Sequence, residues 1–141
     1  MISLIGSVAG VAASLSFFAE FGLKHPPCLL CTIQRILWLS TLSLAILNPI
    51  FKTSAKKLIL LLLALNLCTA SYHTLVQLNM IEDRCKTNLQ IKDEDAYAEI
   101  LKKGETRGCS EDGWKIAKIP APLFNGMVCI SLLYFIWRYR D

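Results

Sequence analysis

The sequence lacks the two features that mark the commonest classes of soluble cofactor-binding and nucleic-acid-binding proteins. No Gly-rich motif of the kind that cradles a nucleotide phosphate occurs in its 141 residues. Lys and Arg do not gather with aromatic residues into a nucleic-acid surface, and the net charge is only +4. We therefore expect no nucleotide cofactor and no nucleic-acid partner.

Apolar residues, in contrast, dominate the chain. Hydrophobic residues make up 54% of it and the mean hydropathy is +0.45, which is high for a soluble protein of this size. A membrane-spanning helix needs about 20 mostly apolar residues, and four segments meet or approach this length: 2–23, 29–50, 58–80 and 120–137. The sequence predicts an all-α integral membrane protein, a four-transmembrane-helix bundle formed by residues 1–141 as a single domain.

The first apolar segment lacks the basic region that opens a signal peptide, so we expect an uncleaved span. Ala-rich residues at 11–13 leave a cleaved signal peptide as the alternative. Gly, Ala and Ser recur through the segment, which favours close helix packing in lipid. Glu20 lies near the end of the segment and is expected to reach the solvated interface.

Residues 81–118 break the apolar pattern with eight Lys or Arg and nine Asp or Glu. They are too polar for a bilayer core, and we expect one long extracytoplasmic loop between the third and fourth helices. The loop contains Cys85, Cys109 and Trp114, and the last of these has the character of an interfacial belt residue. Residues 96–101 have the pattern of a short amphipathic helix on the membrane surface.

A Cys-x-x-Cys pair, Cys28 and Cys31, opens the second apolar segment, and Arg35 follows one turn later. In a helix these three residues share a face. A helix N-terminus and a cation both lower the pKa of a thiol, which favours thiol–disulfide exchange, so we predict a redox pair with Cys31 as the stabilised thiolate. Zinc binding is the alternative, but zinc prefers four ligands and the loop offers no second close pair, so no metal is expected.

Four spans place both chain ends on one side of the membrane and the Cys-x-x-Cys turn together with the 81–118 loop on the other. Cys28, Cys31, Cys85 and Cys109 must then face one compartment, which favours a single thiol circuit. Exposed paired thiols persist as disulfides outside the cytosol. The basic residues argue for the opposite orientation, with nine on the cysteine side and five on the other. We give precedence to the redox argument.

Arg35 and His73 each lie about seven residues, or roughly 10 Å, inside their spans. A cation in lipid costs about 2.5–3.5 kcal/mol at a helix centre, which indicates a partner. A lipid-soluble acceptor with two carbonyl oxygens, such as a quinone, would fit between these side chains. The alternatives are a snorkelling Arg35 and a hydrogen-bonded interior His73. Cys68 and Cys129 are expected to be small apolar fillers.

With these residues placed, the chain resembles the disulfide bond formation protein B family, called DsbB in Gram-negative and BdbC in Gram-positive bacteria. The resemblance covers nearly the whole chain. It differs from the best-known Gram-negative members in its shorter length and in Gln34, where some members have Glu. The matching features are Cys28-x-x-Cys31-x-x-Gln34-Arg35, Tyr72-His73-Thr74, Gln77-Leu78, Cys85 with Cys109, Trp114 and Pro120.

The resemblance implies a protein-dithiol:quinone oxidoreductase in the bacterial cytoplasmic (inner) membrane, with its redox cysteines facing the periplasm or the cell exterior. Cys85 and Cys109 would form a loop disulfide that oxidises a DsbA-like thioredoxin-fold partner, which attacks Cys85. Cys28 would exchange with Cys109, and Cys31 would reduce the quinone, either ubiquinone or menaquinone.

In the same resemblance, Arg35 and His73 would bind the quinone. The alternative to an enzyme is a tetraspan membrane scaffold or thiol sensor whose loop disulfide is structural.

Overall fold

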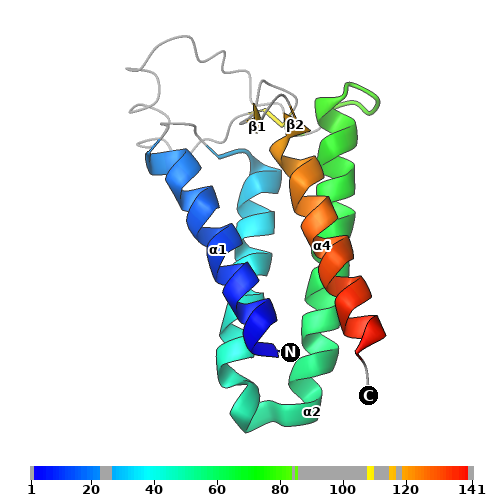
Figure 1. The fold of residues 1–141 in the computed structure, drawn as a ribbon. Helices are drawn as coiled ribbons and strands as arrows, with labels where there is room; N and C mark the ends of the chain where they lie inside the picture. Colours follow the sequence, from blue (N-terminus) through cyan, green and yellow to red (C-terminus); the bar gives the residue numbers. More distant parts are fainter. Residues whose placement is uncertain are drawn as a thin grey trace.

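Three helices and one short strand pair make up the computed structural model, which describes residues 2–22, 27–83, 85, 108–109, 115–116 and 119–139 (Figure 1). The helices are α1 (Ile2–Phe21), α2 (Leu29–Gln77) and α4 (Ala121–Arg138). Strands β1 (Lys115–Ile116) and β2 (Ile119–Pro120) pair antiparallel just before α4. Trp114 and the amphipathic pattern at 96–101 lie outside the described residues.

The long helix α2 contains two membrane spans. It is helical throughout its 49 residues but folds back on itself, so that a first arm, Leu29–Ile50, lies beside a second arm, Ala55–Gln77 (Figure 1). The connection between the two arms is therefore itself helical. Pro49 lies inside the helix next to the fold, where the missing N–H weakens the backbone ladder. With α1 and α4, the two arms give four segments long and apolar enough to cross a membrane, which confirms the predicted four-helix membrane bundle.

The two ends of the bundle differ in what they carry. The N-terminus, the C-terminal end of α4 and the fold of α2 lie at one end, and the start of α2 and both strands lie at the other (Figure 1). Cys28, at the start of α2, therefore lies at the end opposite to both chain termini. We call this end the mouth of the bundle.

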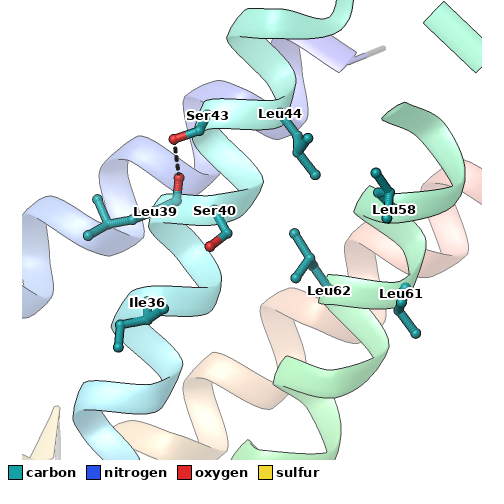
Figure 2. A pocket seen from close by; sticks show the side chains of 8 residues that line it. All are labelled: Ile36, Leu39, Ser40, Ser43, Leu44, Leu58, Leu61 and Leu62. Carbon is teal, nitrogen blue, oxygen red and sulfur yellow. Dashed lines mark hydrogen bonds between the residues drawn. The ribbon is translucent and has the colours of Figure 1, made fainter. Parts of the chain in front are cut away.

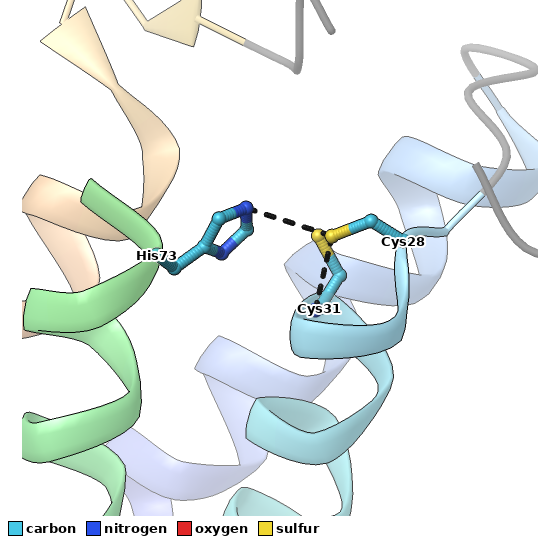
Figure 3. Close-up of side chains that lie close together, drawn as sticks. All are labelled: Cys28, Cys31 and His73. Atoms are coloured by element: carbon cyan, nitrogen blue, oxygen red, sulfur yellow. Dashed lines mark hydrogen bonds between the residues drawn. The ribbon is translucent and has the colours of Figure 1, made fainter. Parts of the chain in front are cut away.

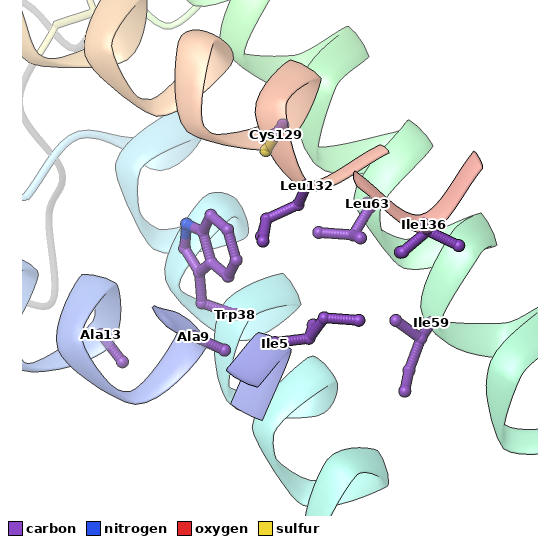
Figure 4. Packing of buried hydrophobic residues seen from close by; sticks show 9 residues of the cluster. All are labelled: Ile5, Ala9, Ala13, Trp38, Ile59, Leu63, Cys129, Leu132 and Ile136. Carbon is purple, nitrogen blue, oxygen red and sulfur yellow. The ribbon is translucent and has the colours of Figure 1, made fainter. Parts of the chain in front are cut away.

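The core of the bundle combines the small Ala9 and Ala13 of α1 with mostly larger side chains, including Ile5 of α1 and those of α2 and α4 (Figure 4). Ala9 is completely buried, and a Cβ at Gly6 would lie 2.9 Å from the Cβ of Ala45. The small side chains of α1 therefore allow close approach to the first arm of α2, as the composition of this segment predicts. The buried core residues are Ile5, Ala9, Ala13, Trp38, Ile59, Leu63, Cys129, Leu132 and Ile136.

A polar chain crosses this core and joins three segments. Trp38 on the first arm donates its Nε1–H to Asn125 Oδ1 on α4 at 2.8 Å. Asn125 Nδ2 in turn donates to Asn66 Oδ1 on the second arm at 3.2 Å. Because few other polar groups are available inside a bilayer, these hydrogen bonds help to fix α4 against both arms of α2.

Candidate redox site

Cys28 caps the N-terminus of α2. Its Sγ accepts a hydrogen bond from the backbone N–H of Cys31 at 3.1 Å, and its carbonyl accepts one from the hydroxyl of Thr32. The first residue of a helix satisfies otherwise unpaired N–H groups in this way. The sequence suggested that the helix N-terminus acts on Cys31. The structure directs the Cys31 N–H to the sulfur of Cys28, and a backbone hydrogen bond with Cys28 also reaches the Cys31 side chain.

His73 on the second arm faces Cys28 across the mouth of the bundle (Figure 3). Its Nε2 lies 3.5 Å from Cys28 Sγ, and the side chain is almost completely buried. The sulfurs of Cys28 and Cys31 and a ring nitrogen of His73 all lie within 4.8 Å of one another. The sequence placed His73 at the depth of Arg35, but the structure shows that its neighbour is the Cys-x-x-Cys pair.

The two loop cysteines meet the Cys-x-x-Cys pair at the same place. Cys109 is buried with Cys28 in one cluster, and Cys31 and Cys85 pack against it. The side chain of Cys109 interacts with the thiols of both Cys28 and Cys85. All six cysteines of the chain are described, and all are free thiols. The structure therefore brings together the four cysteines that the sequence singled out, with Cys109 between the two pairs.

Asp83 belongs to this cluster, although sequence reasoning did not select it. Its carboxylate Oδ1 accepts the backbone N–H of Cys85 at 2.8 Å, and its side chain is 7% exposed. One carboxylate oxygen and the sulfurs of Cys85 and Cys109 lie within 4.8 Å of one another. The available signal was the spacing, because an Asp two residues before Cys85 can form an Asx turn with the backbone N–H of that residue.

The three thiols outside the membrane spans differ in acidity. Hydrogen bonding from the Cys28 thiol, with further bonds from Cys85 and the Leu30 N–H, lowers the pKa of Cys109 to about 6. The same contact with Cys109 raises the pKa of Cys28, which acts as the donor. Burial, followed by the nearby Cys109 and Asp83, raises the pKa of Cys85 to about 12. Cys109 is therefore the thiol of these three that ionises first and is the ready nucleophile.

Arg35 faces α1. Its guanidinium pairs with the carboxylate of Glu20, bonds to the hydroxyl and carbonyl of Ser16 at 3.1 and 3.2 Å, and lies 4.3 Å from the ring centroid of Phe17. The expectation that Glu20 reaches the solvated interface is wrong, because this residue is 7% exposed. The packing of α1 on the first arm places the two charges opposite each other, which offsets the cost of burying either one.

Arg35 remains close to the redox pair, since it lies one turn beyond Cys31 and interacts with it electrostatically. Its described contacts use each of the three guanidinium nitrogens once. The two terminal nitrogens each carry a second N–H, so the side chain retains donors for a further acceptor.

Two buried polar atoms near the redox pair have no hydrogen-bond partner among the described residues. They are Nδ1 of His73 and Nε2 of Gln34, which lies one turn beyond Cys31. Buried polar atoms normally have partners, so unpaired ones indicate a missing ligand or water. The amide N–H of Gln34 is a suitable donor for a carbonyl oxygen of a quinone, and so is the His73 ring in the tautomer that carries its proton on Nδ1. The residues near the pair therefore fit such a group.

A groove between the two arms of α2 has a volume of about 530 Å³ but is a poor site for this chemistry (Figure 2). It is lined by aliphatic side chains and two serines, and the hydroxyl of Ser43 donates to the carbonyl of Leu39. None of its described lining residues is a cysteine or carries a charge. The lining residues are Ile36, Leu39, Ser40, Ser43, Leu44, Leu58, Leu61 and Leu62.

Comparison with known proteins agrees with the geometry of the thiol cluster. The family described as Disulfide bond formation protein DsbB matches residues 1–138. Searches of curated proteins and of solved structures found no match. The family match spans all four membrane helices and all four cysteines of the cluster. The chain therefore belongs to the DsbB family, the multi-pass membrane oxidoreductases of disulfide bond formation.

Proposed function

We propose that the protein is a protein-dithiol:quinone oxidoreductase that reoxidises a DsbA-like thioredoxin-fold partner and so supports disulfide formation in exported proteins. The single observation that carries this proposal is the meeting of Cys28, Cys31, Cys85 and Cys109 in one cluster at the mouth of the bundle. Two cysteine pairs in contact can pass a disulfide from one to the other without large movements of the chain. Family membership supports the same chemistry.

The first exchange takes place at the loop pair. A thiolate of the partner attacks Cys85 in the Cys85–Cys109 disulfide, and Cys109 leaves. Cys85 is only partly buried, whereas Cys109 is 1% exposed, so Cys85 is the sulfur that a second protein can reach. The low pKa of Cys109 makes it a good leaving group.

The second exchange connects the two pairs. Cys109, released as a thiolate, attacks Cys28 in the Cys28–Cys31 disulfide, and Cys31 leaves as a thiolate. Contact between the Cys109 and Cys28 side chains supports this direction of attack. Arg35 provides positive charge one turn from Cys31 and stabilises the sulfur that leaves.

A quinone, ubiquinone or menaquinone, supplies an acceptor for two electrons and two protons when it is bound. Gln34 would hold one carbonyl oxygen with its unpaired amide N–H, His73 would donate in the tautomer that carries its proton on Nδ1, and Arg35 would add a charged donor. The protein would lie in the bacterial cytoplasmic (inner) membrane, with the mouth of the bundle facing the periplasm or the cell exterior. The persistence of loop disulfides outside the cytosol supports this orientation.

Turnover of quinone by the purified protein tests the proposal. Reduced DsbA-type protein and a quinone are supplied, and the loss of quinone absorbance is followed. We expect turnover in the wild type, none after Cys31→Ser, and wild-type turnover after Cys68→Ser, because Cys68 is exposed on the second arm and away from the cluster.

Undiminished turnover after Cys31→Ser would contradict the proposed route. A structural disulfide in a scaffold protein would give three results together. The wild type would show no turnover, its loop disulfide would resist mild reductant, and it would form no mixed disulfide with the partner.

A further inference from the structure

Cys85 must lose a proton each time the loop disulfide re-forms, and the carboxylate of Asp83 lies beside it. We infer that Asp83 is the general base that accepts the proton of Cys85 when Cys85 displaces Cys28 from Cys109. This inference rests on the proposed function, since it assigns a residue to one of its steps.

The end of the second arm explains how Asp83 reaches this position. The N–H groups of Asn79 and Met80 bond to the carbonyls of Val76 and Leu75, and Asn79 has a φ of 55°. This is a Schellman motif with Asn at the left-handed position, which stops the helix and reverses the chain. Three residues after Met80, Asp83 is buried against the thiol cluster.

The contacts of Asp83 hold its carboxylate next to the two sulfurs that must join. Its Oδ1 accepts the N–H of Cys85 at 2.8 Å, which fixes the side chain relative to the Cys85 backbone. The carboxylate and the sulfurs of Cys85 and Cys109 lie within 4.8 Å of one another, and the side chains of Asp83 and Cys85 interact directly. A base must come within hydrogen-bond reach of the proton it removes, and small movements on binding can complete that contact.

The step balances in atoms and electrons. Before it, Cys109 is joined to Cys28, and Cys85 is a thiol. The proton of Cys85 moves to Asp83, the Cys85 sulfur attacks the Cys109 sulfur, and the Cys85–Cys109 bond forms as the Cys109–Cys28 bond breaks. Cys28 leaves with the electron pair as a thiolate, stabilised by the N–H of Cys31 at 3.1 Å. Cys85 is oxidised and Cys28 is reduced.

Cys85 needs such a base because its thiol is hard to ionise. Burial is the first cause that raises its pKa, and Asp83 lies beside it in a position to take its proton. Among the residues that the structure describes, Asp83 faces the thiols of Cys85 and Cys109 and, from the second arm of α2, His73. Glu82 is adjacent in the chain but exposed. Asp83 is therefore the carboxylate that is placed to take the proton of Cys85.

A single-turnover experiment isolates this step without quinone or partner. Fully oxidised protein, freed of quinone, is mixed with one equivalent of dithiothreitol in the presence of a chelator. Samples are quenched with acid and alkylated, and the Cys28–Cys109 disulfide is quantified over time by peptide mass spectrometry. The variants are Asp83→Asn, Asp83→Glu and, as the matched control, Glu82→Gln.

We expect the Cys28–Cys109 species to decay at a rate nearly independent of pH near neutrality in the wild type, the Glu82→Gln control and Asp83→Glu. In Asp83→Asn the species should accumulate, its decay should be at least about tenfold slower at neutral pH, and the rate should rise about tenfold per pH unit, because Cys85 must then ionise without help.

A decay in Asp83→Asn that is as fast as in the wild type, or faster, would overturn the inference, since it would show that the carboxylate only disfavours the thiolate. A slower decay with the flat wild-type pH profile would also overturn it and would make Asp83 structural. If the Cys28–Cys109 species never forms in the wild type, the proposed relay itself fails.

Discussion

At the scale of single residues, variants of the ion pair of Arg35 and Glu20 distinguish the structural role of the Arg35 charge from its role in the redox chemistry. Both side chains are about one-tenth exposed and lie between α1 and the first arm of α2. Removing one partner of a buried pair leaves the other uncompensated, at a cost of about 3–5 kcal/mol. We expect Glu20→Gln to lower the thermal unfolding temperature of the detergent-solubilised protein and Glu20→Asp to lower it less.

The double variant Glu20→Arg with Arg35→Glu is the decisive control, because it keeps the pair but moves the cation from α2 to α1. It should recover part of the lost stability without recovering quinone turnover. Full recovery of both would show that the position of the cation relative to Cys31 does not matter for the chemistry.

The acidity of Cys109 gives a second prediction at this scale. Its pKa is lowered to about 6, first by the hydrogen bond from Cys28. In the fully reduced protein, ultraviolet thiolate absorbance should therefore rise with a midpoint near pH 6, and Cys109→Ser should remove the part of this rise that Cys109 contributes and leave any part from Cys31. Cys28→Ser should shift the midpoint upward unless the serine hydroxyl replaces the donor. Unchanged titration in Cys109→Ser would assign the thiolate to another cysteine.

At the scale of whole elements, the approach of α1 to the first arm depends on Gly6. A Cβ there would lie 2.9 Å from the Cβ of Ala45, which cannot rotate away, whereas the neighbours of a Cβ at Gly10 are Leu42 methyl groups at 3.8 and 3.9 Å. Overpacking typically costs about 1–3 kcal/mol. We expect Gly6→Ala to lower the unfolding temperature and Gly10→Ala to leave it nearly unchanged. Equal effects would mean that α1 shifts freely on α2.

At this scale the sequence predicted the helices better than the contacts between them. Long apolar runs revealed the four membrane segments, and the parity of four spans placed Cys28 and the loop cysteines at one end. Contacts between elements could not be predicted from the sequence in the same way. Glu20 appeared to lie at the interface because its depth was judged from α1 alone, while its pairing depends on how α1 is rotated against α2. Asp83 resembled the other eight acids of the loop until the chain reversal at Asn79 was known.

At the scale of the whole molecule, the arrangement fixes relative positions but leaves two possible insertions in the membrane. Both termini lie at one end and the thiol cluster at the other (Figure 1). Nine basic residues on the cluster side against five on the other argue for a cytoplasmic cluster. The redox chemistry argues for the opposite, because a cytosolic loop disulfide would be kept reduced. The nine acids of residues 81–118 offset the basic residues there, although acids have little weight in topology.

Reporter fusions decide between the two insertions in cells. If the redox argument holds, green fluorescent protein fused after Asp141 should fluoresce, because that end would be cytoplasmic, and alkaline phosphatase at the same place should be inactive. The phosphatase inserted after Lys103, within the long loop, should be active, because it needs an oxidising compartment to form its own disulfides. The reverse pattern would place the cluster in the cytosol, where glutathione and thioredoxin would reduce the loop pair, and would remove the basis for its role in exported proteins.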